Sequence, residues 1–179
     1  MTNREILIGV SGGIASYKTA ALVSQLVQAG HGVSVAMTEA AQQFVGQATF
    51  AALTGRPVAT GIFDDAAHPL GAHIDLAERA ELFCIAPATA NFMAKAASGL
   101  ADDLLSTLYL AFPGKTLIAP AMNCEMWEKP VVQRNLKQLR DDGVEIVDPE
   151  EGWLSCRKRG IGRMAAPETI LAAIEKCWD

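Results

Sequence analysis

The sequence has few cysteines and no pair of them at the spacing of metal ligands. Its four cysteines are Cys84, Cys124, Cys156 and Cys177, and none belongs to a C-x-x-C motif. Zinc sites and redox dithiols usually show such close pairs, so we expect no bound metal. Half of the 179 residues are hydrophobic, so a core can form without disulfides, and the cysteines are expected to be reduced.

An excess of basic charge and long apolar runs are also missing. The net charge is −5, which argues against a general nucleic-acid binder because phosphate neutralisation requires a basic surface. No segment approaches the roughly 20 apolar residues that a membrane span needs. No signal peptide is recognisable at the N-terminus. We therefore expect neither a nucleic-acid nor a membrane partner, and the reduced cysteines indicate a cytoplasmic protein.

Short apolar segments alternate with amphipathic segments along the chain. The segment at residues 48–76 is less regular, and residues 149–164 are predicted to form a long loop of the kind that often serves as a functional lid. The alternation predicts an α/β fold with a doubly wound parallel sheet and helices on both faces. Strands are predicted at residues 5–10, 33–37, 81–86, 115–119 and 144–147, and helices at residues 14–29, 40–45, 90–97, 102–110 and 131–140 and from residue 167.

Four segments directly follow predicted strands: residues 11–15, Thr38, residues 87–91 and residues 120–123. Ligands of such sheets bind at the carboxyl ends of the strands, so these segments should share one crevice. The glycines of the first segment would let backbone N–H groups approach an anion, which the positive end of the following helix also attracts. The same residues are equally compatible with a tight turn that binds nothing.

Three polar side chains have both a functional and an ordinary interpretation. His73 offers the acid–base chemistry of an imidazole, or it is a polar loop histidine. Asn123 can orient a carboxylate or an amide, beside an apolar wall from Met126 and Trp127, or it caps the following helix. Cys156 lies among glycines and basic residues, which suggests a flap with a reactive thiol, or it is an incidental surface cysteine.

Taken together, these segments resemble the homo-oligomeric flavin-containing cysteine decarboxylases. The matching strings run through nearly the whole chain in the family's order, and P-A-M-N-x-x-M-W at residues 120–127 is very specific. The other strings are S-G-G-I-A-S-Y-K at residues 11–18, H-I at 73–74, A-P-A-T-A-N at 86–91, G-L-A-D-D-L-L-S-T at 99–107, and G-I-G-R-M at 160–164, where the flap ends.

The resemblance implies one Rossmann-like flavoprotein domain over residues 1–179, with a flap at about residues 149–164 and FMN held non-covalently. It also implies a homotrimer or a dodecamer of trimers, with each site lying between subunits. The implied FMN contacts are Gly12, Gly13, Ile14, Thr38, Thr89, Ala90, Asn91, Ser106 and Ala121.

The activity implied by the resemblance is decarboxylation of 4′-phosphopantothenoylcysteine to 4′-phosphopantetheine, a step of coenzyme A biosynthesis. FMN would oxidise the thiol-bearing carbon so that carbon dioxide can leave, and the product would then be reduced. His73 would assist the oxidation, Asn123 would hold the carboxylate, and Cys156 would supply the final proton. Met126 and Arg163 would contact the substrate. We expect no fused synthetase in this chain, and a separate phosphopantothenoylcysteine synthetase is a candidate partner.

Two residues depart from the family pattern. Phe92 stands where the family usually has Thr, beside the expected flavin, and Arg157 stands where Gly usually follows the flap cysteine. The competing activities are oxidative decarboxylation of a C-terminal peptidyl cysteine, flavin prenyl transfer, and non-catalytic regulation of a phosphatase. Cys156 favours the pantothenate-derived substrate because a peptidyl-cysteine decarboxylase needs no flap cysteine. A plain NAD-binding module is the weakest alternative, since no G-x-G-x-x-G motif is present.

Overall fold

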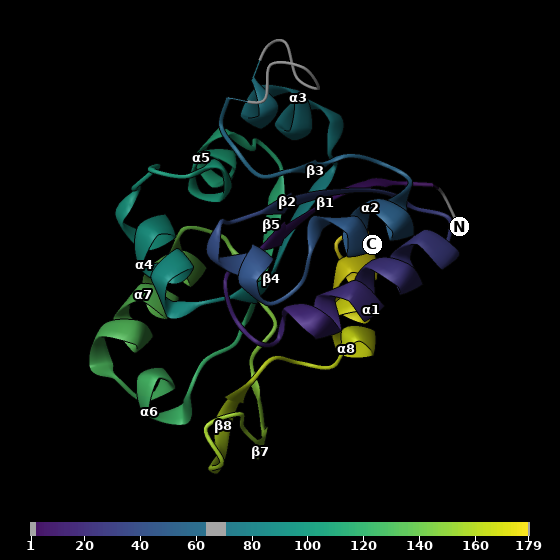
Figure 1. Cartoon of the computed structure of the whole chain (residues 1–179). Helices are drawn as coiled ribbons and strands as arrows, with labels where there is room; N and C mark the ends of the chain where they lie inside the picture. The colour runs from purple at the N-terminus through teal and green to yellow at the C-terminus, as the bar shows by residue number, and fades with distance from the viewer. Residues whose placement is uncertain (1–2, 64–70, 179) are drawn as a thin grey trace.

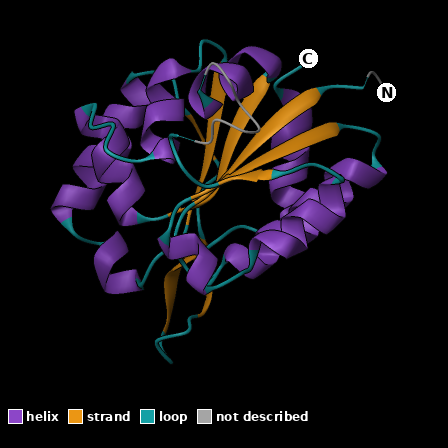
Figure 2. Ribbon diagram, turned by 45° about the horizontal axis from the view of Figure 1, so that its top comes forward, coloured by secondary structure: helices purple, strands orange, loops and turns teal. Residues whose placement is uncertain are grey.

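The computed structural model describes residues 3–63 and 71–178 and shows a parallel sheet between two layers of helices (Figure 1; Figure 2). Six parallel strands lie in the order β3-β2-β1-β4-β5-β6. This confirms the predicted α/β, Rossmann-like doubly wound sheet. The strands are β1 Glu5–Val10, β2 Gly32–Met37, β3 Val58–Ala59, β4 Leu82–Ala88, β5 Lys115–Pro120 and β6 Glu145–Ile146.

The helices divide between the two faces of the sheet. On one face, α1 (Ser16–Gln28), α2 (Gln47–Thr54) and α8 (Pro167–Lys176) bury their apolar sides. The other face is covered by α3 (Ala72–Arg79), α4 (Ala90–Ser98), α5 (Leu104–Ala111) and α7 (Pro130–Asp141). The short helices η1 (Ala40–Gln43) and α6 (Cys124–Trp127) lie beyond strand ends. Within the described ranges, no helix has both the length and the apolar character needed to cross a membrane.

The predicted long loop at residues 149–164, here called the flap, is instead mostly an antiparallel hairpin. Its strands are β7 (Glu150–Trp153) and β8 (Arg159–Arg163), and it projects away from the sheet (Figure 1). Charged residues and glycines fill these strands, so the apolar alternation that signals a strand is missing.

The segment at residues 48–76 is more regular than predicted, because most of α2, all of β3 and the start of α3 fall within it. His73 lies on α3 and is not a loop residue. His68, whose position between Ala67 and Pro69 predicts a loop, lies outside the described residues.

Arg157 occupies the turn of the flap with a φ of 62°, and it is the one non-glycine residue with positive φ in the described part of the chain. The turn is tight: the Leu154 N–H donates to the Lys158 carbonyl at 2.9 Å, and the Arg157 N–H donates to the Leu154 carbonyl at 2.9 Å. A side chain in this left-handed conformation costs roughly 1–2 kcal/mol relative to ordinary backbone. Glycine, which the family usually has at this position, would adopt the same conformation without this cost.

Replacing Arg157 with glycine should stabilise the flap turn by about 1 kcal/mol, because glycine adopts the left-handed conformation without a Cβ conflict. Hydrogen exchange of peptides covering residues 154–163, followed by mass spectrometry, should slow several-fold. Arg157→Ala is the matched control, since it removes the same guanidinium group but keeps the Cβ atom. Equal slowing in both variants would show that the side chain, and not the backbone conformation, limits the turn.

Candidate functional site

A cavity of about 890 Å³ opens at the carboxyl ends of the central strands. This volume lies near the upper end of the roughly 300–1,000 Å³ typical of small-molecule pockets. The four segments predicted to share one crevice all contribute to the wall of this cavity. They do so with residues 11–15, Thr38, residues 89–91 and residues 121–123. The flap forms the remaining side of the cavity with residues 153–156 and 162–164.

The turn between β1 and α1 presents backbone donors to this cavity. The N–H groups of residues 12–15 have no hydrogen-bond acceptor among the described residues, whereas the next three N–H groups donate back to carbonyls of residues 13–15. Gly12 cannot carry a side chain, because a methyl group there would overlap Ala40. Free donors at the N-terminus of the 13-residue helix α1 attract an anion. These free donors give the turn the chemistry to bind an anion such as a phosphate.

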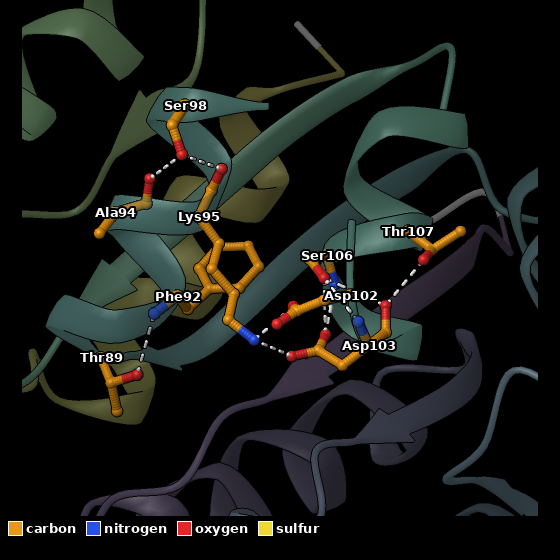
Figure 3. Close-up of polar contacts among 9 residues, drawn as sticks. All are labelled: Thr89, Phe92, Ala94, Lys95, Ser98, Asp102, Asp103, Ser106 and Thr107. Carbon is orange, nitrogen blue, oxygen red and sulfur yellow. Dashed lines mark hydrogen bonds and ion pairs between the residues drawn. The ribbon is translucent and has the colours of Figure 1, made fainter. Parts of the chain in front are cut away.

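Ser11 and Thr89 join the ends of β1 and β4 beside this turn. The Ser11 hydroxyl donates to the Pro87 carbonyl at 2.7 Å, and the Thr89 N–H donates to Ser11 Oγ at 3.0 Å. Thr89 also caps α4, since its Oγ1 accepts a hydrogen bond from the Phe92 N–H at 3.3 Å (Figure 3). These bonds fix the N-terminus of α4, so that Thr89 and the two residues after it form part of the wall.

Phe92 packs against the body of the protein as well as lining the cavity. Its side chain is 3% exposed and meets the Tyr109 ring edge-on, with the ring centroids 6.1 Å apart. The aromatic side chain at this position, where the family usually has Thr, is thus accommodated by the core formed between α4 and α5.

An ion cluster in the cavity wall was not predicted from the sequence. The Lys95 ammonium lies 2.5 Å from an Asp102 oxygen and 2.7 Å from an Asp103 oxygen, and it links α4 to the start of α5 (Figure 3). The hydrogen bonds to Asp102 and Asp103 raise the pKa of Lys95. Burial opposes ionisation of Asp103, but the hydrogen bonds from Lys95 and from Ser106 hold the pKa of Asp103 below its ordinary value. Lys95 and Asp103 are therefore both charged at neutral pH.

Two predicted site residues are not among the described residues that line the cavity: Ser106 and His73. The Ser106 hydroxyl donates to Asp103 Oδ1 at 2.8 Å and completes the capping box of α5, so it orients an acid that does line the wall. His73 lies in the first turn of α3, and its buried Nδ1 has no hydrogen-bond partner in the described ranges.

Asn123 follows β5, where it caps the next helix, as one of its two interpretations expected, and also lines the cavity. Its Oδ1 accepts a hydrogen bond from the Glu125 N–H at 2.7 Å, which caps α6, and the residue also lines the cavity. With Oδ1 so engaged, the amide nitrogen is the group left to face a ligand. Met126 lines the cavity as predicted, whereas Trp127 packs against the core on the sheet face that α3, α4, α5 and α7 cover.

The flap brings Cys156, Arg163 and Met164 to the cavity. Cys156 is a free, exposed thiol, and the Arg163 guanidinium donates to Glu150 at 2.8 Å. Lys18 was not predicted as a site residue. Its ammonium extends from α1 to the flap and donates to the Met164 carbonyl at 2.8 Å. Burial, reinforced by the nearby Arg163 charge, lowers the pKa of Lys18. No group of three or more potential metal ligands is found among the residues that the structure describes.

Comparison with known proteins places these features in a family. Residues 1–178 match the family model described as Flavoprotein. The bifunctional coenzyme A biosynthesis protein CoaBC of Bacillus subtilis (strain 168) is 47% identical over 176 residues, which make up 98% of this chain and 43% of that protein. The chain thus spans less than half the length of this relative.

Two solved structures share the fold over almost their whole length. A cysteine-to-serine mutant of PPC decarboxylase, complexed with pantothenoylaminoethenethiol, superposes with a TM-score of 0.87 at 26% identity, covering 99% of both chains. SpaF, an FMN-dependent cysteine decarboxylase, superposes with a TM-score of 0.83 at 35% identity, covering 98% of both chains. The match to the family over residues 1–178, with the fold and cavity just described, shows that this chain belongs to the flavoprotein family.

Proposed function

We propose that this chain binds FMN and decarboxylates 4′-phosphopantothenoylcysteine to 4′-phosphopantetheine in coenzyme A biosynthesis. The observation that carries this proposal is the meeting of an anion-binding turn, a free Asn123 amide nitrogen and the Cys156 thiol in one cavity. The 47% identity to CoaBC and the likeness to PPC decarboxylase support this substrate over others.

FMN fits the groups that this cavity presents. The free N–H groups after β1 would hold its phosphate, and Gly12 leaves room for a close approach. Ile14, Thr38, Asn91 and Ala121 would supply the remaining polar and apolar contacts. When bound, FMN would supply reversible two-electron oxidation and reduction.

The chain's own residues would bind and protonate the substrate. The Asn123 Nδ2 group would donate a hydrogen bond to the substrate carboxylate, and its neutral amide would not repel that charge. Met126 would pack against the apolar part of the substrate, and Arg163 would bind it from the flap side. Cys156 would deliver the final proton from Sγ while the flap keeps water out of the cavity.

His73 would act in the cavity of a neighbouring subunit, within a homotrimer or a dodecamer of trimers. This assignment is supported by its location, since His73 lies outside the wall of its own chain's cavity while Asn123 and Cys156 lie within it. The neighbouring Ile74 is 37% exposed and could pack against a second copy. A phosphopantothenoylcysteine synthetase, which would supply the substrate, is proposed as a partner.

A second candidate is oxidative decarboxylation of a C-terminal peptidyl cysteine, in which the unsaturated thiol is the final product. The likeness to SpaF, whose name states cysteine decarboxylation without a pantothenate substrate, supports it. The two candidates differ in whether Cys156 is needed, so the products of the wild type and of a Cys156 variant, compared side by side, separate them.

The first prediction concerns the cofactor. Gly12→Val should weaken FMN binding at least about tenfold, because the added side chain overlaps Ala40 and displaces the anion-binding turn. Flavin fluorescence titration of the apoprotein measures this, with circular dichroism as the check on folding. Gly46→Val is the control, since a Cβ atom at Gly46 meets no atom within 4 Å. Unchanged FMN affinity in a folded Gly12→Val protein would remove the turn from the binding site.

A second prediction concerns the last proton. Cys156→Ser should still release carbon dioxide but accumulate the ethenethiol, two hydrogens lighter than the saturated thiol, because a hydroxyl is a much weaker acid than a thiol. The two electrons would stay on the flavin until dissolved oxygen reoxidises it. Mass spectrometry of the product identifies it. The ethenethiol complex of the PPC decarboxylase cysteine-to-serine mutant supports this expectation. Release of the ethenethiol by the wild type itself would favour the peptidyl-cysteine type of reaction, or show an inactive flap.

A third prediction tests the shared site. His73→Asn and Asn123→Asp should each retain FMN and lose decarboxylation when assayed alone. Trimers assembled from equal amounts of the two variants should recover activity in about a quarter of their sites, because a site between subunits can draw both intact residues from different chains. Refolding the variants separately before mixing gives the baseline. If the mixed trimers stay inactive while wild-type trimers refold to full activity, His73 and Asn123 serve the same chain's site or no site at all.

A further inference from the structure

The base of the flap is fixed to the loop and helix that follow β5. The Met122 N–H donates to the Gly162 carbonyl at 2.9 Å. Gly160 packs closely on α6, since a Cβ atom there would lie 2.9 Å from the Cys124 Cβ atom. These contacts hold β8 beside α6, but they lie several residues away from the turn that carries Cys156.

The tip of the flap, residues 154–158, is joined to the body of the protein by an ion pair. The Lys158 ammonium pairs with the Glu125 carboxylate of α6. Within the described part of the chain, this is the one hydrogen bond or ion pair between residues 154–158 and residues outside the flap. The other polar contacts of the tip are the two backbone bonds within its own turn.

The pair joins the two sides of the cavity at their functional residues. Lys158 follows Cys156 by two positions, and Glu125 follows Asn123 by two positions. The Glu125 N–H also donates to Asn123 Oδ1, so the carboxylate partner is attached to the residue proposed to hold the substrate. The hydrogen bond from Lys158 lowers the pKa of Glu125, and the same bond raises the pKa of Lys158, so both groups stay charged through the neutral range.

We propose that Lys158 and Glu125 form a latch that holds the Cys156 thiol over the cavity. The two are positioning residues for the last proton transfer, and the proposal rests on the proposed function for that step. Both side chains are more than half exposed, so the pair contributes little to the stability of the whole fold. The tip is held to the body of the protein by this pair, however, so even a small interaction energy determines what fraction of the time the Cys156 thiol lies over the cavity.

The first test needs no substrate and no turnover. Lys158→Glu and Glu125→Lys each replace the attraction with repulsion, and the double variant restores it with the charges exchanged. Hydrogen exchange of residues 154–163 should be up to about fivefold faster in each single variant and return to the wild-type rate in the double variant. The exposed Lys137–Asp141 pair on α7 supplies the control, and its exchanged variants should leave the flap unchanged.

The second test reads the product. Each single variant, assayed in air so that dissolved oxygen reoxidises the flavin left reduced, should keep FMN and release a larger fraction of the ethenethiol than the wild type. The double variant should restore the saturated thiol. Wild-type product ratios and exchange rates in both single variants would overturn the latch, as would faster exchange without any change in product. A wild type that consumes no substrate would refute the proposed function instead. The exchange rates would then still decide whether the pair holds the flap.

Discussion

The position of β1 between β2 and β4 is the constraint on which the site depends. Residues 6–10 of β1 are fully buried, with Ile6 and Ile8 in the core on one face of the sheet and Leu7 in the core on the other. Parallel pairing on both sides brings three strand ends to one place. The Thr38 N–H donates to the Val10 carbonyl at 3.0 Å, and the Ser11 N–H donates to the Pro87 carbonyl at 3.3 Å. The loops after these strands must therefore meet, whatever ligand they hold.

This arrangement gives the cavity two walls of different construction. The wall at the strand ends is fixed by backbone hydrogen bonds and by the buried Ser11 and Thr89 contacts, so its free N–H groups are organised before any ligand arrives. The wall made by the flap is attached to the rest of the protein through Lys18, Met122, Glu125 and Ala166, and three of these four bonds involve a charged side chain. A cofactor suits the first wall and a substrate that must enter and leave suits the second.

Much of this could be predicted from the sequence, because buried parallel strands are nearly continuous apolar runs and ligand loops follow them. The flap hairpin could not, because the register of Glu150 against Arg163 follows from pairing across a turn and not from any apolar pattern. The ion pairs of Lys95 with Asp102 and Asp103 could not be predicted either. The two acids lie seven and eight residues away, across a corner between two helices, where helical spacing rules do not apply.

The three consecutive basic residues 157–159 have three different structural roles, although such a run usually indicates only a solvent-exposed surface. Arg159 lies 3.4 Å from Glu151 and braces the hairpin, whereas Lys158 reaches out of the flap to Glu125. Arg157 contributes a backbone conformation that a side chain disfavours. Arg157, one position after Cys156, weakens the turn. An ion pair at the next residue, Lys158, therefore restrains the part of the flap that needs it most. Arg157 and Lys158 thus have opposite effects on the flap tip. Arg157, in place of glycine, destabilises the turn, and the ion pair from Lys158 to Glu125 restricts the positions that the tip can adopt.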